Sequence, residues 1–550
     1  MSEAKQPSTS NNRLDAVIVG AGFAGLYMLH RLRGLGLSAR VFEAGGDVGG
    51  TWYWNRYPGA RCDIESMQYS YSFSDELQQE WRWTERFSGQ PEILRYANHV
   101  ADRFDLRRDI QFGTRVTVAT FDEASNRWQV ETDRGDRVSA AFCIMATGCL
   151  SSGRVPAIKG IDTFAGASYH TGQWPHGGVD FTGQRVGVIG TGSSAIQSIP
   201  VIAEQAAHVY VFQRTPNFSV PARNTPLPPD YEGEWKASYA ERRARARTLR
   251  SGTIYDFGEM SALAVSPEQR SQEYAARWER GGINVMVAYN DLATSKEAND
   301  TAADFVRGQI RAIVQDPAVA EMLAPTSHPI GTKRICVDTG YYETFNRSNV
   351  TLVNLQATPI EEVTPAGIRT RDAEYAVDSI VYATGFDAMT GSLLKADIRG
   401  RGGMTLQEKW AAGPRTYLGL MTAGFPNLFT ITGPGSPSVL SNMIVSIEQH
   451  VDWIAGCLAY LRSHGVKCIE ADIQAEDNWV AHVNEVAYTT LYPQANSWYM
   501  GANIEGKPRV FMPYIGGVGV YRQTCDTVAA NGYEGFRLTL QHEMASAAAE

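Results

Sequence analysis

Two glycine-rich turns in this chain are of the kind that binds the pyrophosphate of a dinucleotide. Each follows a short apolar run and precedes a segment with helical spacing, which is the context that makes such a turn informative. Glycine allows the tight bend and the close approach of backbone to phosphate, and the N-terminus of the helix supplies N–H donors. The alternative is that these glycines only turn the chain. The residues predicted to surround the two pyrophosphates are Gly20, Gly22 and Gly25, and then Gly190, Gly192, Ser193 and Ser194.

The residue that ends the second strand of each unit indicates which nucleotide the unit binds. Glu43 follows the run 39–42, where its carboxylate can bind ribose hydroxyls and would repel a 2′-phosphate, so the first unit is predicted to bind FAD. Gln213 takes the equivalent place in the second unit, and Arg214 and Thr215 follow it. A guanidinium beside a hydroxyl suits a 2′-phosphate and favours NADPH over NADH. An ordinary surface arginine at a strand end is the alternative for Arg214.

The seven cysteines are scattered along the chain and include no C-x-x-C pair. This pattern argues against a zinc site or a disulfide framework and favours a reducing compartment. It also argues against the disulfide reductases, the other large class built on two dinucleotide-binding units. The sequence therefore predicts a flavin enzyme that is reduced by a nicotinamide nucleotide.

The composition of the 550-residue chain is that of an ordinary globular protein, with 43% hydrophobic residues and a net charge of −9. The length allows two or three cores, and the negative charge gives no general attraction to nucleic acid or anionic membranes. Residues 1–12 are polar, and no segment offers about 18 uninterrupted apolar residues, so neither a signal peptide nor a spanning helix is predicted. We therefore expect a cytoplasmic enzyme without a nucleic-acid, membrane, metal or obligate protein partner.

The order of strands and turns predicts an α/β fold in which two Rossmann-like dinucleotide-binding domains are nested. Ala-Thr-Gly turns beginning at Ala146 and Ala383 each follow an apolar strand, and they mark where the chain crosses between domains. The segment 221–330 is rich in Glu, Arg and Ala with helical spacing, which predicts a helical insert on the substrate side. The predicted domains are an FAD-binding domain of residues 1–150 and 387–550, an NADP-binding domain of residues 151–220 and 331–386, and the insert of residues 221–330.

Two longer patterns accompany these units. F-x-G-x-x-x-H-x-x-x-W-P precedes the second glycine turn and is formed by Phe164, Gly166, His170, Trp174 and Pro175. G-x-W-x(4)-Y-P-G-x(3)-D is formed by Gly50, Trp52, Tyr57, Pro58, Gly59 and Asp63. With both patterns in order, the chain resembles the type I Baeyer–Villiger monooxygenases over nearly its whole length, and most of all their phenylacetone and steroid monooxygenase branch.

This resemblance implies a reaction and two catalytic residues. NADPH would reduce FAD, O₂ would be captured as a C4a-peroxyflavin, and attack on a hydrophobic ketone (aryl, cyclic or steroid-like) would give an ester or lactone, with thioether sulfoxidation as a side activity. An anionic flavin peroxide and a tetrahedral oxyanion both require a fixed cation, and Arg334 matches the family's catalytic arginine. Asp63 matches the carboxylate that lies near this arginine, orients it and holds it cationic.

The resemblance also implies contacts to the cofactors. Lys333 is expected to bind the 2′-phosphate together with Arg214 and Thr215. Thr51 and Trp52 are expected along the flavin, an aromatic core being the alternative for Trp52.

Further expectations concern the linker and the substrate side. His170 is expected to fix the interdomain linker, with a core histidine as a near-equal alternative. Trp498 matches a mobile loop that folds over the nicotinamide and excludes water. The residues expected to line the ketone pocket are Ser438, Val439, Leu440 and Met443, of which Met443 also contacts the cofactor.

Two other functions remain as alternatives. An N- or S-oxygenating flavin monooxygenase would differ at Trp174-Pro175, and ester formation from a ketone separates the two classes. A flavoprotein that only binds nucleotides, as a redox sensor or interaction module, would need neither Asp63 nor Arg334. Failure of NADPH to bleach the bound flavin would favour this last alternative.

Overall fold

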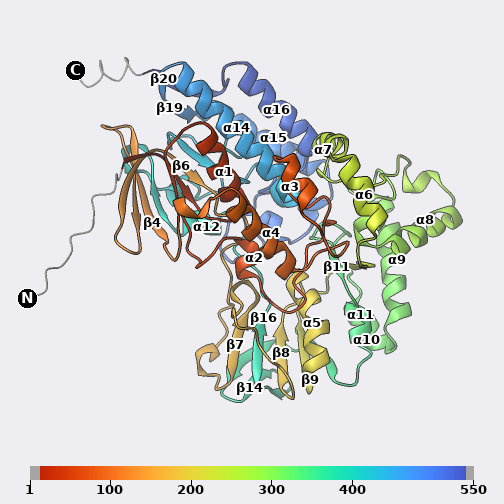
Figure 1. Ribbon diagram of the computed structural model, residues 1–550. Coiled ribbons are helices and arrows are strands. Elements are labelled where there is room, and N and C mark those ends of the chain that lie inside the picture. The colour runs from red at the N-terminus through yellow and green to blue at the C-terminus, as the bar shows by residue number, and fades with distance from the viewer. Residues whose placement is uncertain (1–12, 541–550) are drawn as a thin grey trace, which may run out of the picture.

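Two sheets built around parallel strands organise the chain in the computed structural model, which describes residues 13–540 (Figure 1). The polar residues 1–12, on which the expectation of no signal peptide rests, lie outside this range. The larger sheet is drawn at the upper left of Figure 1, the second sheet at the bottom, and the green helices of the insert at the right. The predicted α/β fold with two nested dinucleotide-binding units is confirmed.

The larger sheet is built around β1, which pairs in parallel with β2 and β6. Ala16, Val17 and Ile18 of β1 are fully buried, as expected for a central parallel strand that is covered on both faces. The helix α1 (Phe23–Gly34) packs against α14 (Met443–Ser463), so the two ends of the chain share one core. The strands of this sheet are β1 (Arg13–Val19), β2 (Ala39–Phe42), β3 (Ile110–Gln111), β4 (Val116–Asp122), β5 (Arg127–Thr132), β6 (Arg137–Met145), β17 (Asp397–Arg399) and β18 (Leu428–Thr430).

The second sheet has the order β12-β9-β8-β16-β7, and all its pairs are parallel. Its central strands are joined by α5 (Ser193–Gln205), which follows the second glycine turn. Its strands are β7 (Ala167–His170), β8 (Arg185–Ile189), β9 (His208–Gln213), β12 (Val350–Asn354) and β16 (Ser379–Tyr382). Beside it lie the antiparallel strands β13 (Ile360–Thr364), β14 (Gly367–Thr370) and β15 (Glu374–Ala376), the parallel pair β10 (Ser219–Pro221) and β11 (Cys336–Asp338), and α11 (Tyr341–Thr344).

Residues between β10 and β11 fold into helices and turns that contribute to both cores. Trp235 and Tyr239 lie in the core of the larger sheet, whereas Tyr274, Trp278 and the buried face of α9 lie in the core of the second sheet. The insert therefore bridges the two nucleotide-binding units. Its helices are α6 (Pro229–Ala237), α7 (Tyr239–Thr248), α8 (Pro267–Arg280), α9 (Lys296–Ile313) and α10 (Pro317–Leu323).

The remaining elements complete the larger unit. β19 (Val466–Ala471) and β20 (Phe536–Leu540) form an antiparallel pair. The other helices are α2 (Thr51–Trp54), α3 (Asp75–Glu80), α4 (Gln90–Arg103), α12 (Gly391–Leu394), α13 (Leu406–Lys409), α15 (Ile473–Tyr488) and α16 (Val518–Ala530). In the part of the chain that is described, no helix combines the length and apolarity needed to cross a membrane, and no cluster of three His, Cys, Asp or Glu side chains is placed to hold a metal ion.

Candidate functional site

The first glycine turn connects β1 to α1, and two of its glycines leave no room for a side chain. Gly20 has φ +106°, and a Cβ there would lie 2.7 Å from the carbonyl oxygen of Ala146. A Cβ on Gly25 would lie 1.8 Å from the carbonyl oxygen of Gly20. Gly22 is the N-cap of α1, so the N–H groups of the first helical turn are available to a pyrophosphate.

Glu43 follows β2 beside this turn. Its carboxylate is 5% exposed and accepts hydrogen bonds from the backbone N–H groups of Ala21 and Gly45, each at 2.6 Å. Burial raises the pKa of Glu43, and the two N–H donors oppose that increase. The acid is thereby held at the strand end where a dinucleotide of this kind places its ribose.

Gly25→Ala is expected to abolish FAD binding. The added Cβ must displace the Gly20 carbonyl and with it the bend that surrounds the pyrophosphate, and overpacking of this kind costs about 1–3 kcal/mol. Flavin absorbance per protein and thermal unfolding measure the effect. Gly34→Ala near the end of the same helix is the control, because a Cβ there meets nothing within 4 Å. Full flavin content in Gly25→Ala would contradict the assignment.

The second glycine turn connects β8 to α5 and borders open space. Gly190 has φ +113°, and a Cβ there would lie 2.4 Å from the carbonyl oxygen of Ala383. In contrast, no atom lies within 4 Å of a Cβ built on Gly192. The hydroxyl of Ser193 lies 3.2 Å from the Cys336 sulfur, and that of Ser194 lies 3.1 Å from the Thr171 hydroxyl. The turn is therefore shaped for the backbone to approach a ligand closely.

Two cations meet beside this turn. Arg214 follows the end of β9, and Lys333 comes from the segment that leads into β11. Burial, and then the neighbouring Arg214, lower the pKa of Lys333. Within residues 13–540 no acidic side chain forms an ion pair with either cation. Thr215 is held close to the second glycine turn, because its carbonyl oxygen accepts a hydrogen bond from the Thr191 hydroxyl at 2.9 Å. Such a pair of unneutralised cations suits a phosphate.

Arg334 and Asp63 form a bidentate ion pair at the junction of the two units. Nε and Nη2 of Arg334 donate to Asp63 at 2.9 and 2.7 Å, and Nη1 donates to the carbonyl oxygen of Val439 at 2.8 Å. Burial alone would lower the pKa of Arg334, but the adjacent Asp63 carboxylate raises it above its ordinary value. About a third of the Arg334 side chain is exposed. The guanidinium is thus permanently cationic and fixed in direction, and its side chain is partly accessible.

The residues of the first longer pattern gather around β7. His170 ends this strand, and its Nδ1 accepts the Gly172 N–H at 3.0 Å while its Nε2 lies 3.2 Å from the Arg154 carbonyl oxygen. Burial lowers the pKa of His170, which favours the neutral ring. Because Nδ1 accepts the Gly172 N–H, the proton of the neutral ring is on Nε2. Its ring also meets Phe386 edge to face. His170 therefore connects the linker after β6 with the turn after β16.

The other members of this pattern support the same region. A Cβ on Gly166 would lie 2.3 Å from the carbonyl oxygen of Asp378, and Phe164 packs on the core of the second sheet. Trp174 is buried, and its backbone N–H donates to the Trp54 carbonyl oxygen of the other unit at 3.3 Å. Pro175 begins the turn that follows, in which its carbonyl accepts the Gly178 N–H.

The residues expected on the flavin and substrate side occupy different environments. Thr51 is exposed at the start of α2, whereas Trp52 is 7% exposed and donates its indole N–H to the Tyr69 hydroxyl at 3.1 Å. Ser438 is fully buried with φ +42°, and its hydroxyl lies 2.9 Å from the Cys149 sulfur. In this conformation Ser438 holds the loop rather than facing open space, and its place in a pocket stays a prediction.

One apolar cluster joins most of the expected substrate-side residues. Val439, Leu440, Met443 and Trp498 belong to it, and the Val439 carbonyl is the group that accepts Nη1 of Arg334. The cluster therefore lies against the fixed cation.

Two further members of this cluster were missed by the sequence reasoning. Tyr499 is 2% exposed and interacts electrostatically with Arg334, and its neighbour Trp498 was the available signal. Cys149 follows the first crossing turn, and its sulfur lies 2.9 Å from the Ser438 hydroxyl; no pattern in the sequence marks it.

The chain is similar over nearly its whole length to known monooxygenases. Residues 17–250 match the family model described as pyridine nucleotide-disulphide oxidoreductase. A Baeyer–Villiger monooxygenase of Pseudooceanicola batsensis is 44% identical over 96% of this chain and 97% of its own. A phenazine N-monooxygenase of Lysobacter antibioticus is 42% identical over 95% of this chain and 97% of its own. A solved structure of oxidised steroid monooxygenase bound to NADP is 57% identical, with a TM-score of 0.92, over 96% of this chain and 99% of that one.

Two nucleotide-binding units that meet at a fixed arginine define a flavoprotein oxidoreductase that uses a nicotinamide nucleotide. More narrowly, the chain belongs to the Baeyer–Villiger monooxygenase family, and its cofactors are FAD and NADP(H). The residues present fit both groups: glycines without room for a Cβ, open space at Gly192, and a cation pair that has no acidic partner in the described part of the chain. All seven cysteines lie in the described part of the chain and are free and buried.

Proposed function

We propose that this chain converts hydrophobic ketones, aryl, cyclic or steroid-like, to esters or lactones with NADPH and O₂. The observation that carries the proposal is the Arg334–Asp63 pair, a cation of raised pKa held beside an apolar cluster. An apolar surface accepts a hydrophobic ketone, and a directed guanidinium stabilises the negative oxygen that forms when the carbonyl is attacked.

The chain's own residues have separate roles in this proposal. FAD, when bound, supplies the transfer of two electrons from NADPH and the activation of O₂. Glu43 and the first glycine turn hold FAD, and Lys333, Arg214 and Thr215 hold the 2′-phosphate of NADPH. Asp63 directs Arg334, while Trp498 and its neighbours exclude water.

The two cofactors are assigned to separate domains. We assign residues 1–150 and 387–550 to FAD and residues 151–220 and 331–386 to NADP, with 221–330 as the bridging insert. The support is the sheet order, in which β16 pairs with β8 and β18 pairs with β6. The free cysteines support a reducing compartment such as the cytoplasm.

The test is product formation with isotope labelling. The purified protein is given NADPH and ¹⁸O₂ with phenylacetone, cyclohexanone or progesterone, and the products are identified by mass spectrometry. An ester or lactone with one labelled oxygen, formed in proportion to NADPH oxidised, is expected from at least one ketone. Hydrogen peroxide equal to the NADPH consumed, with no ester from any of the three, would contradict the proposal.

N-oxygenation is a second candidate, favoured by the N-monooxygenase among the relatives. Phenazine in the same assay tests it, because an N-oxide and an ester differ in mass and retention. A labelled N-oxide formed without any ester from the ketones would establish this alternative.

A further inference from the structure

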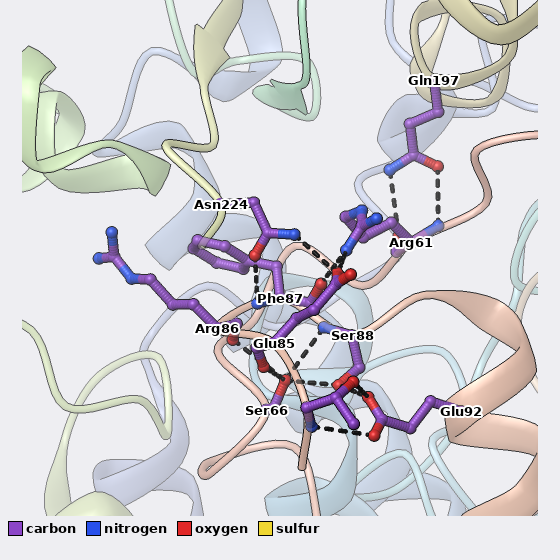
Figure 2. Close-up of polar contacts among 10 residues, drawn as sticks. Arg61, Ser66, Glu85, Arg86, Phe87, Ser88, Glu92, Gln197 and Asn224 are labelled. Carbon is purple, nitrogen blue, oxygen red and sulfur yellow. Dashed lines mark hydrogen bonds and ion pairs between the residues drawn. The ribbon is translucent and has the colours of Figure 1, made fainter. Parts of the chain in front are cut away.

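The loop of residues 57–63 lies between the two units and ends at Asp63. On one side it meets α5, the helix that follows the second glycine turn. Gln197 of α5 uses its whole carboxamide on this loop: Oε1 accepts the Tyr57 hydroxyl at 2.8 Å and the Arg61 N–H at 3.3 Å, and Nε2 donates to the Arg61 carbonyl at 3.0 Å. Figure 2 shows the amide of Gln197 facing the Arg61 backbone across this boundary. One side chain thus joins the two units by three hydrogen bonds.

The backbones of the loop and of α5 also approach closely at this point. Gly59 has φ +76°, and a Cβ there would lie 2.3 Å from the carbonyl oxygen of Gln197 and 3.2 Å from a methyl group of Val201. Tyr57 and Gly59 are therefore both explained by contact with α5, and they belong to the same sequence pattern as Asp63. The sequence pattern therefore includes residues that contact the other unit, and it ends with the carboxylate residue Asp63.

The opposite side of the loop is braced by the larger unit and by the start of the insert. The Arg61 guanidinium donates to the Glu85 carboxylate and to the Phe87 carbonyl. Asn224, which follows β10, donates to the same Glu85 carboxylate at 2.8 Å and accepts the Phe87 N–H at 2.9 Å. In Figure 2 the Arg61 and Asn224 side chains converge on Glu85. The loop is therefore held by hydrogen bonds on both sides and is not a loose segment.

The two ends of this connection are the proposed NADP phosphate site and the proposed catalytic pair. Gln197 lies four residues after Ser193, about one helical turn from the start of α5. Asp63 lies two residues after Arg61 and holds Arg334 by two hydrogen-bonding oxygens. We propose that Gln197 is a positioning residue that couples nucleotide binding at the second glycine turn to the placement of Arg334 by Asp63. The inference rests on the proposed NADP site.

Hydrogen–deuterium exchange of the FAD-loaded enzyme, with and without NADP⁺, tests this coupling directly. The Arg61 N–H donates one of the three hydrogen bonds to Gln197. Deuterium exchange of the backbone amides of residues 57–63 therefore reports whether this hydrogen bond is present. In the wild type, NADP⁺ is expected to slow exchange both at 190–195 and at 57–63. In Gln197→Met, which keeps the length of the side chain but loses the amide, protection at 190–195 is expected to remain and the response at 57–63 to disappear.

The matched control is Gln205→Met at the other end of α5, where the glutamine is exposed and contacts its own unit. It should respond to NADP⁺ as the wild type does. The amount of ester formed per NADPH oxidised should fall at least about two- to tenfold in Gln197→Met, because the amide makes three hydrogen bonds and the loss of a single neutral one already costs that factor. It should not fall in the control. Tyr57→Phe removes one of the three bonds and serves as a second variant if Gln197→Met does not fold.

The outcomes separate the coupling from the nucleotide site. An undiminished NADP⁺ response at 57–63 in both Gln197→Met and Tyr57→Phe would overturn the coupling, as would equal product ratios in Gln197→Met and its control. Absence of NADP⁺ protection at 190–195 in the wild type would overturn the assigned nucleotide site, and the coupling with it.

Discussion

Arg334→Ala is expected to lower the rate of ester formation by about 10²- to 10³-fold, the cost of removing one donor that stabilises an oxyanion. Nη1 of Arg334 is held toward Val439, and the pKa of the side chain is raised by Asp63. The substitution removes the charge without touching either glycine turn. FAD binding and reduction of the flavin by NADPH should therefore continue, with the electrons released as hydrogen peroxide.

Anaerobic bleaching of the flavin, followed by separate assays of ester and peroxide, distinguishes this outcome from general damage. Arg223→Ala is a suitable control, since Arg223 is partly exposed and pairs with Glu279 on the insert. Undiminished ester formation in Arg334→Ala would remove the catalytic assignment.

The Asp63 carboxylate complicates this variant, because it loses its partner. Leaving one member of an ion pair unpaired has its own cost, and this cost adds to the loss of the cation in the single variant. The double variant Arg334→Ala/Asp63→Asn separates the two contributions in a double-mutant cycle. If Asp63 acts only by directing Arg334, the double variant should be no slower than Arg334→Ala.

The local features of this protein were predictable because each is set by residues close together in the sequence. The strands that precede the glycine turns, and Glu43 at the end of β2, are read from hydrophobic runs and spacing. The positive φ of Gly20 and Gly190 follows from the same short context. The two Ala-Thr-Gly turns follow the strands β6 and β16, and the domain boundaries assigned to them stay a prediction.

The contacts between distant segments were not predictable from spacing alone. Gln197 belongs to none of the sequence patterns, and its hydrogen bonds to Tyr57 and Arg61 form only when α5 packs against the 57–63 loop. Likewise Ser438 was expected to line a pocket, yet its environment depends on how Cys149 from another crossing of the chain packs against it. The pairing of Arg334 with Asp63 came from resemblance to a family, since 271 positions separate them in the sequence.

Lys333→Ala is expected to abolish the preference for NADPH over NADH, chiefly by raising KM for NADPH about 10- to 100-fold. A charge-assisted hydrogen bond contributes about 1.5–3 kcal/mol, and about 1.4 kcal/mol is a factor of ten in binding. Lys333 and Arg214 lie together without an acidic partner in the described chain, and the lowered pKa of Lys333 reflects this mutual repulsion after burial. A bound 2′-phosphate neutralises this repulsion, so the position of Lys333 beside Arg214 makes binding of the phosphate more favourable.

The decisive measurement is the ratio of kcat/KM for NADPH to that for NADH. NADH has no 2′-phosphate, so its KM should change little in Lys333→Ala, and the ratio should fall by the full factor. Lys159→Ala provides the control, since Lys159 is largely exposed in the same unit and pairs with Glu362. An unchanged ratio in Lys333→Ala would mean that Arg214 and Thr215 bind the phosphate without it. Equal losses for both nucleotides would instead place Lys333 in the structure of the segment before β11 rather than in recognition of the phosphate.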